Sequence, residues 1–350
     1  MPFGLPWHGR GASGHTQPQS QETLLAAART AAECLVHDLD QARRLTADWT
    51  NQKLSDALVE TALSTCLHRL AHTGCWGDAN RLPSQELWRI AGPLLEVGVL
   101  QHRARFKPRG YAGDYQMLHW IATDYCCEHP LGRVFDRYFQ RQAAPQAVRS
   151  RTAQIAAALA AHCLQGAAAG YHVVSVGAGP ASDVRQALAL LPADHRRRLR
   201  VTLLDLDPEA LEFARGQVQP LLAPDALHCV RENLYRLPRR SQPQQVFETA
   251  DFLACPGLFD YLDDETAVEM LRLFWQRLGA GGLLLAGNFA PHNPTRAYME
   301  WIGNWYLTYR TAQDLERLGI QAGIPTGQFS IGSEALGVDL FLIARKQAKF

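Results

Sequence analysis

The sequence lacks the features of several protein classes. No run of its 350 residues reaches the about 18 consecutive apolar positions of a membrane-spanning helix, and residues 1–20 hold no apolar core of signal-peptide length. Lys and Arg total 35 against 34 Asp and Glu, which gives no electrostatic case for nucleic acid or an anionic membrane as the main partner. We therefore expect a globular cytoplasmic protein that acts on a small molecule, with a homodimer as an open option.

The spacing of the eight cysteines indicates neither a metal site nor a disulfide scaffold. None makes a Cys-x-x-Cys pair and no cluster has zinc-like spacing, so we predict no metal site. A disulfide scaffold would be unexpected in a chain of this length without an export signal. We expect reduced cysteines, mostly buried, that pack as small hydrophobic side chains.

The N-terminal part of the chain has the pattern of helices. Apolar residues recur at three- and four-residue spacings in three segments, Glu22–Asp38, Lys53–Thr73 and Gln85–Leu100. Three prolines are expected to start or break these helices: Pro83, Pro93 and Pro108. The sequence predicts a disordered tail over residues 1–20 and an all-helical unit of about five to seven helices over residues 21–150.

Residues 151–350 alternate between strand and helix patterns. The predicted strands are Tyr171–Val176, Arg200–Leu204, Leu227–Arg231, Ala250–Cys255 and Gly282–Gly287, with a closing hairpin of Gln328–Ile331 and Val338–Ala344. The predicted helices are Ile155–Leu164, Ala181–Leu191, Pro208–Gln217, Asp264–Leu278 and Ala312–Leu318. This order predicts an α/β, Rossmann-like domain whose parallel sheet carries helices on both faces and ends in an antiparallel strand.

A glycine turn marks the expected ligand edge of that sheet. The first strand runs into Gly177, Ala178, Gly179 and Pro180, and a helix follows. Glycine lets the backbone turn sharply and approach a ligand closely, and ligands bind at the carboxyl ends of the strands in such sheets. NAD, FAD and S-adenosylmethionine proteins all use such a turn, and a plain strand–helix turn is the alternative.

Residues at the next strand ends narrow the choice of cofactor. Asp205, at the tip of the second strand, is placed to accept both hydroxyls of a ribose, whereas Asp207 before a proline fits a helix cap. Asn233 is placed to bind the adenine amino group and Leu234 to cover the ring, although a polar loop residue is the alternative for Asn233. Leu206 and Pro256 complete this predicted wall.

Two further features favour S-adenosylmethionine over a dinucleotide. The dinucleotide fingerprint requires a third glycine where Ser182 stands. The passage Leu278–Leu283 (LGAGGL) is typical of the fifth strand of class I methyltransferases. Ser175 replaces the acidic residue usual two positions before the first glycine, so the methionine end has no assigned partner. We expect Arg151, Tyr111 and Tyr115 to complete the cofactor site.

Several motifs together resemble one bacterial family, the extracellular-factor 3-hydroxypalmitic acid methyl ester synthases. They are Lys107–Tyr115 (KPRGYAGDY), Ala147–Arg151 (AVRSR), Gly257–Leu262 (GLFDYL), Gly287–Phe289 (GNF) and Trp305–Thr311 (WYLTYRT). The resemblance covers roughly residues 100–345. It implies a class I methyltransferase that converts a 3-hydroxy fatty acid into its methyl ester, a quorum-sensing signal.

Candidate chemical residues lie in and beyond these motifs. The glycine-framed stretch Arg109–Tyr115 is predicted to be a lid over the cofactor that brings Arg109 to the substrate, or else a linker packed on the sheet. Tyr261 and Asn288, at the ends of the fourth and fifth strands, are expected to contact substrate, as is Trp305. Helical spacing from Trp301 onward is expected to bring Tyr309 and Arg310 to one face, where they would contact a carboxylate or the cofactor.

The acceptor decides which of these residues acts. A carboxylate is already ionised at its reference pKa of about 4 and needs no base, so Arg109, Tyr115 and Arg310 would only position it. A hydroxyl or amine needs a base, for which Asp260 and His119 are the candidates, although Asp260 could equally cap a helix or pair with an arginine. The open alternatives are N- or O-methylation of another metabolite, an NAD-dependent oxidoreductase, and a non-catalytic cofactor-binding regulator.

Overall fold

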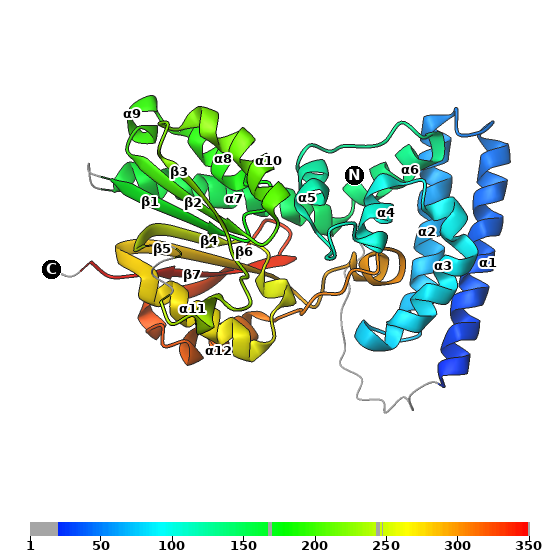
Figure 1. Ribbon diagram of the computed structural model, residues 1–350. Coiled ribbons are helices and arrows are strands. Elements are labelled where there is room, and N and C mark those ends of the chain that lie inside the picture. The colour runs from blue at the N-terminus through cyan, green and yellow to red at the C-terminus, as the bar shows by residue number, and fades with distance from the viewer. Residues whose placement is uncertain (1–19, 167–169, 243–245, 247, 349–350) are drawn as a thin grey trace.

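A computed structural model describes residues 20–166, 170–242, 246 and 248–348. The tail expected over residues 1–20 therefore lies, apart from Ser20, outside the described residues. The chain forms a helical part and a sheet part that stand side by side (Figure 1). In the described part of the chain, no helix is long and apolar enough to cross a membrane.

The helical part consists of helices, as expected. They are α1 (Gln21–Leu45), α2 (Gln52–Ala71), α3 (Arg81–Leu95), α4 (Val99–Phe106), α5 (Tyr115–Ala122), α6 (Pro130–Gln140) and α7 (Ala143–Gln165). Helix α7 runs through residue 150 and leads directly into the sheet part. The expectation that Pro93 starts or breaks a helix is wrong. Pro93 lies inside α3, where its ring is exposed and the buried Ala91 and Leu95 hold the helix against the core.

The sheet has seven strands in the order β3-β2-β1-β4-β5-β7-β6. They are β1 (Tyr171–Val176), β2 (Leu199–Asp205), β3 (Leu227–Arg231), β4 (Ala250–Cys255), β5 (Leu278–Phe289), β6 (Phe329–Ser333) and β7 (Asp339–Arg345). Strands β1 to β5 are parallel, and β7 runs antiparallel to both β5 and β6. The predicted Rossmann-like sheet with an antiparallel C-terminal end is confirmed. Strand β5 begins four residues before the predicted Gly282 because Leu278 pairs with Ala250 ahead of an irregularity.

Helices cover both faces of this sheet (Figure 1). They are α8 (Ser182–Leu190), α9 (Ala193–Arg196), α10 (Pro208–Val218), α11 (Asp264–Arg277) and α12 (Ala312–Gln321). The apolar sides of α7, α8 and α10 pack on one face, and those of α11 and α12 pack on the other. Asp207 caps α10 by accepting a hydrogen bond from the backbone N–H of Glu209, as predicted.

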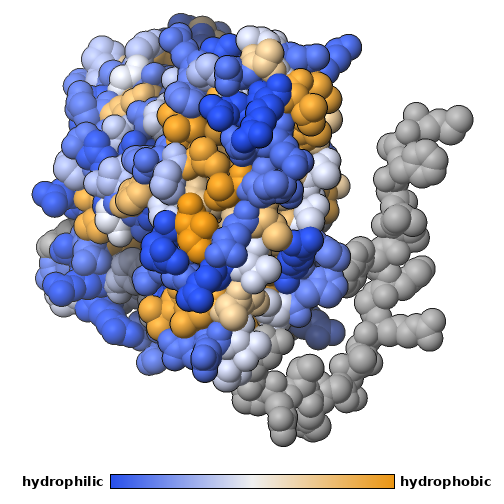
Figure 2. Space-filling view, turned by 90° about the vertical axis from the view of Figure 1, so that its right-hand side faces the viewer, coloured by the Kyte–Doolittle hydropathy of each residue, from blue (hydrophilic) through white to orange (hydrophobic). Residues whose placement is uncertain are grey.

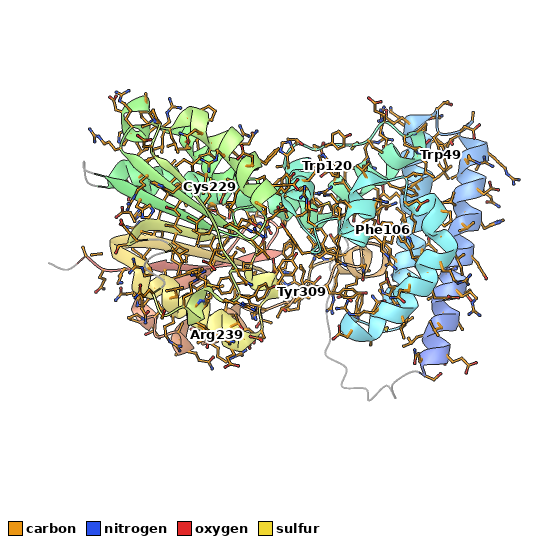
Figure 3. The ribbon with its side chains drawn as sticks, in the orientation of Figure 1. Trp49, Phe106, Trp120, Cys229, Arg239 and Tyr309 are labelled. Atoms are coloured by element: carbon orange, nitrogen blue, oxygen red, sulfur yellow. The ribbon has the colours of Figure 1, made fainter. Side chains whose placement is uncertain are left out.

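A segment from the sheet part locks the two parts together. Tyr298–Ile302 forms a π-helical turn whose Trp301 is completely buried in the same apolar core as helices α1 to α6. Side chains fill the junction, where Figure 3 labels Trp120 and Tyr309. The expectation that one helix face runs from Trp301 to Arg310 is wrong. The turn ends at Ile302, Asn304 takes a left-handed conformation (φ 49°), and residues 304–310 are not helical.

The outer side of the helical part carries no single large apolar surface in the view of Figure 2. Its hydrophobic residues lie as separate patches between hydrophilic ones (Figure 2). Exposed apolar side chains of this part include Leu45, Leu54, Leu82 and Phe106. Single exposed apolar residues are normal on protein surfaces, so these patches do not test the homodimer, which stays a prediction.

Candidate active site

A cavity of about 250 Å³ opens at the carboxyl ends of the parallel strands, beneath the helical part. Its floor is the glycine turn after β1 and the residues that follow β2 and β4. Its roof comes from α5, α7 and the segment between α4 and α5. The predicted site residues on its wall are Tyr111, Tyr115, Arg151, Gly177, Ala178, Gly179, Pro180, Asp205, Leu206, Leu234, Pro256, Asp260, Tyr261 and Trp305.

The glycine turn needs its glycines. Gly177 and Gly179 both have positive φ angles, 64° and 50°, a region that other residues enter at a cost. The turn is tied to the tip of β2, because the backbone N–H of Gly179 donates to Asp205 Oδ2 over 2.9 Å. The N–H of Asp207 donates to Asp205 Oδ1 over 3.0 Å. The carboxylate of Asp205 is therefore held rigidly beside the turn, where a ribose diol was expected.

The predicted lid packs on the sheet part through its backbone. Tyr111, Ala112 and Gly113 line the cavity. The Tyr261 hydroxyl donates to the carbonyl of Ala112 over 3.0 Å, and Trp305 Nε1 donates to that hydroxyl over 2.9 Å. Burial raises the pKa of the Tyr111 phenol, and the charges of Asp205 and Asp207 raise it further. Tyr111 thus lies within the field of the predicted ribose carboxylate.

Other residues of this region lie off the cavity wall. Arg109 points to the start of α10, where it pairs with Glu209 and lies 3.8 Å from Asp207. The ring of His119 packs against Phe213 with centroids 4.9 Å apart, and burial lowers its pKa. The structure therefore brings neither Arg109 nor His119 to the wall, because each has a partner on α10.

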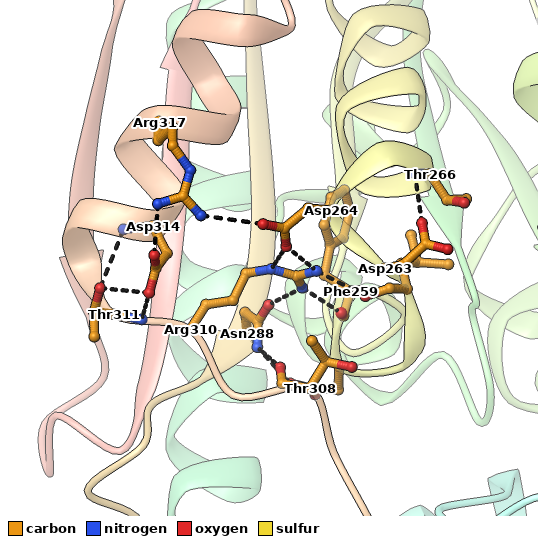
Figure 4. A network of polar contacts seen from close by, with 12 residues as sticks. Phe259, Asp263, Asp264, Thr266, Asn288, Thr308, Arg310, Thr311, Asp314 and Arg317 are labelled. Atoms are coloured by element: carbon orange, nitrogen blue, oxygen red, sulfur yellow. Dashed lines mark hydrogen bonds and ion pairs between the residues drawn. The ribbon is translucent and has the colours of Figure 1, made fainter.

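Arg310 is a structural residue in this fold. Its guanidinium is buried and donates to the carbonyls of Phe259 and Leu262, to Asn288 Oδ1 and to Asp264, over 2.7–3.0 Å (Figure 4). Arg310 and Asn288 are absent from the cavity wall, as is Tyr309. The expected contact with a substrate carboxylate fails because the guanidinium is occupied in holding the loop after β4.

A group of buried charges lies where β4, β5, β7 and α7 meet. Arg151 Nη1 pairs with Asp339 Oδ2 over 2.6 Å, and both residues are almost fully buried. Asp260 Oδ1 accepts hydrogen bonds from Asn288 Nδ2 (3.0 Å) and from the N–H of Phe289 (2.7 Å). Burial, with the nearby charge of Asp339, raises the pKa of Asp260 to about 8. Asp260 is thus a carboxyl group on the cavity wall that can exchange a proton near neutral pH.

The adenine side of the site is only partly as expected. Leu206, Leu234 and Pro256 lie on the cavity wall. Asn233 lies in a neighbouring, second pocket that also has Leu206 on its wall. Among the described residues, Asn233 Oδ1 is a buried oxygen without a hydrogen-bond partner, so it is available to accept from an amino group.

Two parts of the wall were missed from the sequence. The first is an apolar surface from the helical part and the segment that locks into it, formed by Leu118, Ile121, Phe139, Val148, Met299 and Leu307. No motif of the sequence singled out these residues as part of the site. The second is the buried carboxylate of Asp183 at the start of α8. The stretch Gly-x-Gly-x-x-x-Asp was the available signal, because it places an acid in the first turn after the glycines.

Comparison with known proteins agrees with this fold. No protein-family model and no curated protein matches the chain. Among solved structures, one described as a possible exported protein from Bordetella parapertussis is 20% identical, with a TM-score of 0.55 over 96% of this chain and all of the other. At such identity the likeness shows a shared fold.

Weaker similarities are to methyltransferases. The carbon methyltransferase of CurJ is 13% identical, with a TM-score of 0.49 over 94% of this chain and 91% of the other. Magnesium protoporphyrin IX methyltransferase from Synechocystis PCC 6803, solved with S-adenosylhomocysteine, is 15% identical, with a TM-score of 0.43 over 59% of this chain and 89% of the other.

Proposed function

We propose that the protein is an S-adenosylmethionine-dependent methyltransferase that acts on a small, largely apolar molecule. The observation that carries this proposal is the position of Asp205. Its carboxylate is fixed beside the glycine turn, in a cavity whose opposite wall is apolar. A nucleoside cofactor at the edge of the sheet and an apolar acceptor beneath the helical part would both bind in this cavity.

The residues present fit this cofactor. Asp205 would bind the ribose diol, Leu206 and Leu234 would enclose the adenine, and the unpartnered Oδ1 of Asn233 would accept from its amino group. Arg151 would hold the methionine carboxylate, since it lies on the cavity wall and its recorded hydrogen bond, to Asp339, is made by Nη1, which leaves its other N–H donors for a ligand. The bound cofactor supplies an electrophilic methyl group on a sulfonium, and the protein has to align the acceptor and exclude water.

For the acceptor, we propose a 3-hydroxy fatty acid that is converted into its methyl ester. The apolar wall, which includes Phe139, Val148 and Met299, suits an acyl chain. The acceptor carboxylate is ionised near neutral pH and attacks without a base. Arg109 and Arg310 have other partners, and the Tyr261 hydroxyl already donates to the carbonyl of Ala112. Of the residues expected to position the acceptor, this reading leaves Tyr115 on the cavity wall.

A hydroxyl or amine acceptor is the second candidate, and Asp260 favours it. This residue lies on the cavity wall, and its raised pKa gives it the strength of a base near neutral pH. Such an acceptor would pass its proton to Asp260 as the methyl group transfers. The two candidates therefore differ in whether turnover needs this carboxyl group.

Product analysis distinguishes these readings. The protein is incubated with methyl-labelled S-adenosylmethionine and a panel of 3-hydroxy fatty acids, fatty alcohols and apolar amines, and the products are identified by mass spectrometry. The ester reading predicts labelled methyl esters and little effect of Asp260→Asn. Asp263→Asn is the matched control, because Asp263 caps α11 outside the cavity. Cofactor binding without transfer to any acceptor would instead indicate a regulator.

A further inference from the structure

One carboxylate of the cavity has no assigned task. Asp183 is the second residue of α8 and lies on the cavity wall just after the glycine turn. The residue is only 5% exposed, and its Oδ2 has no hydrogen-bond partner among the described residues. Backbone N–H groups of Asp183 and Val184 act on this carboxyl group, but Oδ2 is left without a donor. A buried acceptor without a donor is costly, so this oxygen can receive a positively charged or hydrogen-donating ligand.

The other carboxylates on the wall already accept hydrogen bonds within the protein. Each oxygen of Asp205 accepts a backbone N–H, and Asp260 Oδ1 accepts two N–H groups. Two lone pairs of Asp205 still suit the neutral hydroxyls of a ribose. In the described part of the chain, Asp183 Oδ2 is the carboxylate oxygen on the cavity wall that is buried and has no hydrogen-bond donor. It is therefore the better partner for a cation.

Ser175, at the end of β1, is a neutral residue where an acidic one was expected. Its neighbours Val174 and Val176 face α11 and α12, so Ser175 faces α7 and α8, the side from which Arg151 and Asp183 come. Its Oγ is buried and unpartnered in the described structure, and it is absent from the cavity wall. The end of β1 thus offers no negative charge to a ligand, and the first turn of α8 does.

Arg151 supplies the opposite charge nearby. Burial raises the pKa of Asp183, whereas the backbone N–H groups of Val184 and Asp183 and, to a smaller extent, the positive charge of Arg151 lower it. Both residues lie on the cavity wall, one on α7 and one on α8. A buried cation and a buried anion on adjacent helices form a site that complements a zwitterion, such as the amino acid end of a ligand.

We propose that Asp183 Oδ2 binds the α-ammonium group of the cofactor's methionine end, while Arg151 faces its α-carboxylate. This inference rests on the proposed cofactor. It moves the acidic partner of the ammonium from the end of β1, where Ser175 stands, to the first turn of the following helix. Recognition then depends on the full amino acid end of the ligand and not on its nucleoside alone.

Three ligands test the inference on the intact protein by titration calorimetry. They are S-adenosylhomocysteine, its analogue in which hydrogen replaces the α-amino group, and 5′-methylthioadenosine, which lacks the amino acid end. We expect the wild type to bind S-adenosylhomocysteine about 10- to 100-fold more tightly than the deaminated analogue, as for one charged hydrogen bond. Asp183→Asn should lose that preference and leave the affinity for 5′-methylthioadenosine unchanged.

Asp205→Asn is the matched control, because it makes the same chemical change at the ribose. It should weaken all three ligands by similar factors. If Asp183→Asn binds S-adenosylhomocysteine as tightly as the wild type, the inference is wrong and the proposed cofactor stands. If the wild type binds none of the three ligands, the proposed function itself is wrong. Should Asp183→Asn not fold, equal wild-type affinities for S-adenosylhomocysteine and its deaminated analogue would overturn the inference.

Discussion

Gly113 offers the sharpest test of how the segment Arg109–Tyr115 packs over the cavity. Its φ angle is 71°, and a Cβ built there would lie 2.7 Å from a Trp305 ring carbon and 3.1 Å from the Tyr261 hydroxyl. Gly110, three residues earlier in the same segment, has a φ angle of 84° with nothing within 4 Å of its Cβ position. Alanine at either position meets the same backbone strain, and only Gly113→Ala meets a collision.

The magnitudes follow from that difference. Left-handed backbone costs a non-glycine residue roughly 1–2 kcal/mol, and overpacking a tight site adds about 1–3 kcal/mol. The free energy of unfolding, measured by urea titration, should therefore fall by about 1–2 kcal/mol in Gly110→Ala and about 2–5 kcal/mol in Gly113→Ala. Trp305 cannot yield easily, because it is 7% exposed and its Nε1 donates to Tyr261.

Ligand binding completes this test. Tyr111 and Ala112 line the cavity beside Gly113, so displacing the segment should also weaken S-adenosylhomocysteine. Gly110 is not on the wall, so Gly110→Ala should bind it nearly as the wild type does. Equal losses of stability in the two variants, or unchanged binding in Gly113→Ala, would refute the packing of the lid against Tyr261 and Trp305.

Three further predictions concern charged residues. Arg310→Ala should lower the unfolding free energy by at least about 3 kcal/mol, because three buried acceptors lose their donor at about 1–3 kcal/mol each; a urea midpoint near that of the wild type would contradict this. Arg109→Ala should leave the urea midpoint nearly unchanged, because water and salt screen its exposed partner Glu209. Burial raises the pKa of Asp260 in the folded state, so this group holds its proton more tightly in the native than in the unfolded chain and its contribution to stability falls as pH rises from about 4 to 8. Asp260→Asn removes this contribution, so the free energy of unfolding of the variant, measured by urea titration, should fall less or rise more than that of the wild type over this pH range.

Local signals in the sequence were enough to predict the strands of the sheet and many of the residues expected to bind the cofactor. Strand patterns that end in glycine or aspartate fixed where Gly177, Gly179 and Asp205 would meet, because the carboxyl ends of parallel strands share one edge. Asp207 was identified as a cap from its place before a proline. These features depend on a few neighbouring residues, which is why they could be predicted.

Residues whose position depends on distant partners could not be predicted. Arg310 was expected in the site on helical spacing, but the turn ends at Ile302 and buried acceptors from β4 and β5 bind its guanidinium. Pro93 was expected to start or break a helix, yet core packing holds α3 together around it. Ser182 was used only to exclude a dinucleotide, and the neighbouring Asp183 was overlooked because its burial appears only in three dimensions.

Cofactor identity is the claim on which the account depends, and one titration tests it most directly. The full-length protein is titrated with S-adenosylhomocysteine and, separately, with NAD, and the heat of binding is measured in each case. We predict one molecule of S-adenosylhomocysteine bound per chain, weaker binding of it by Asp205→Asn, and no binding of NAD. Binding of NAD without binding of S-adenosylhomocysteine would contradict the account.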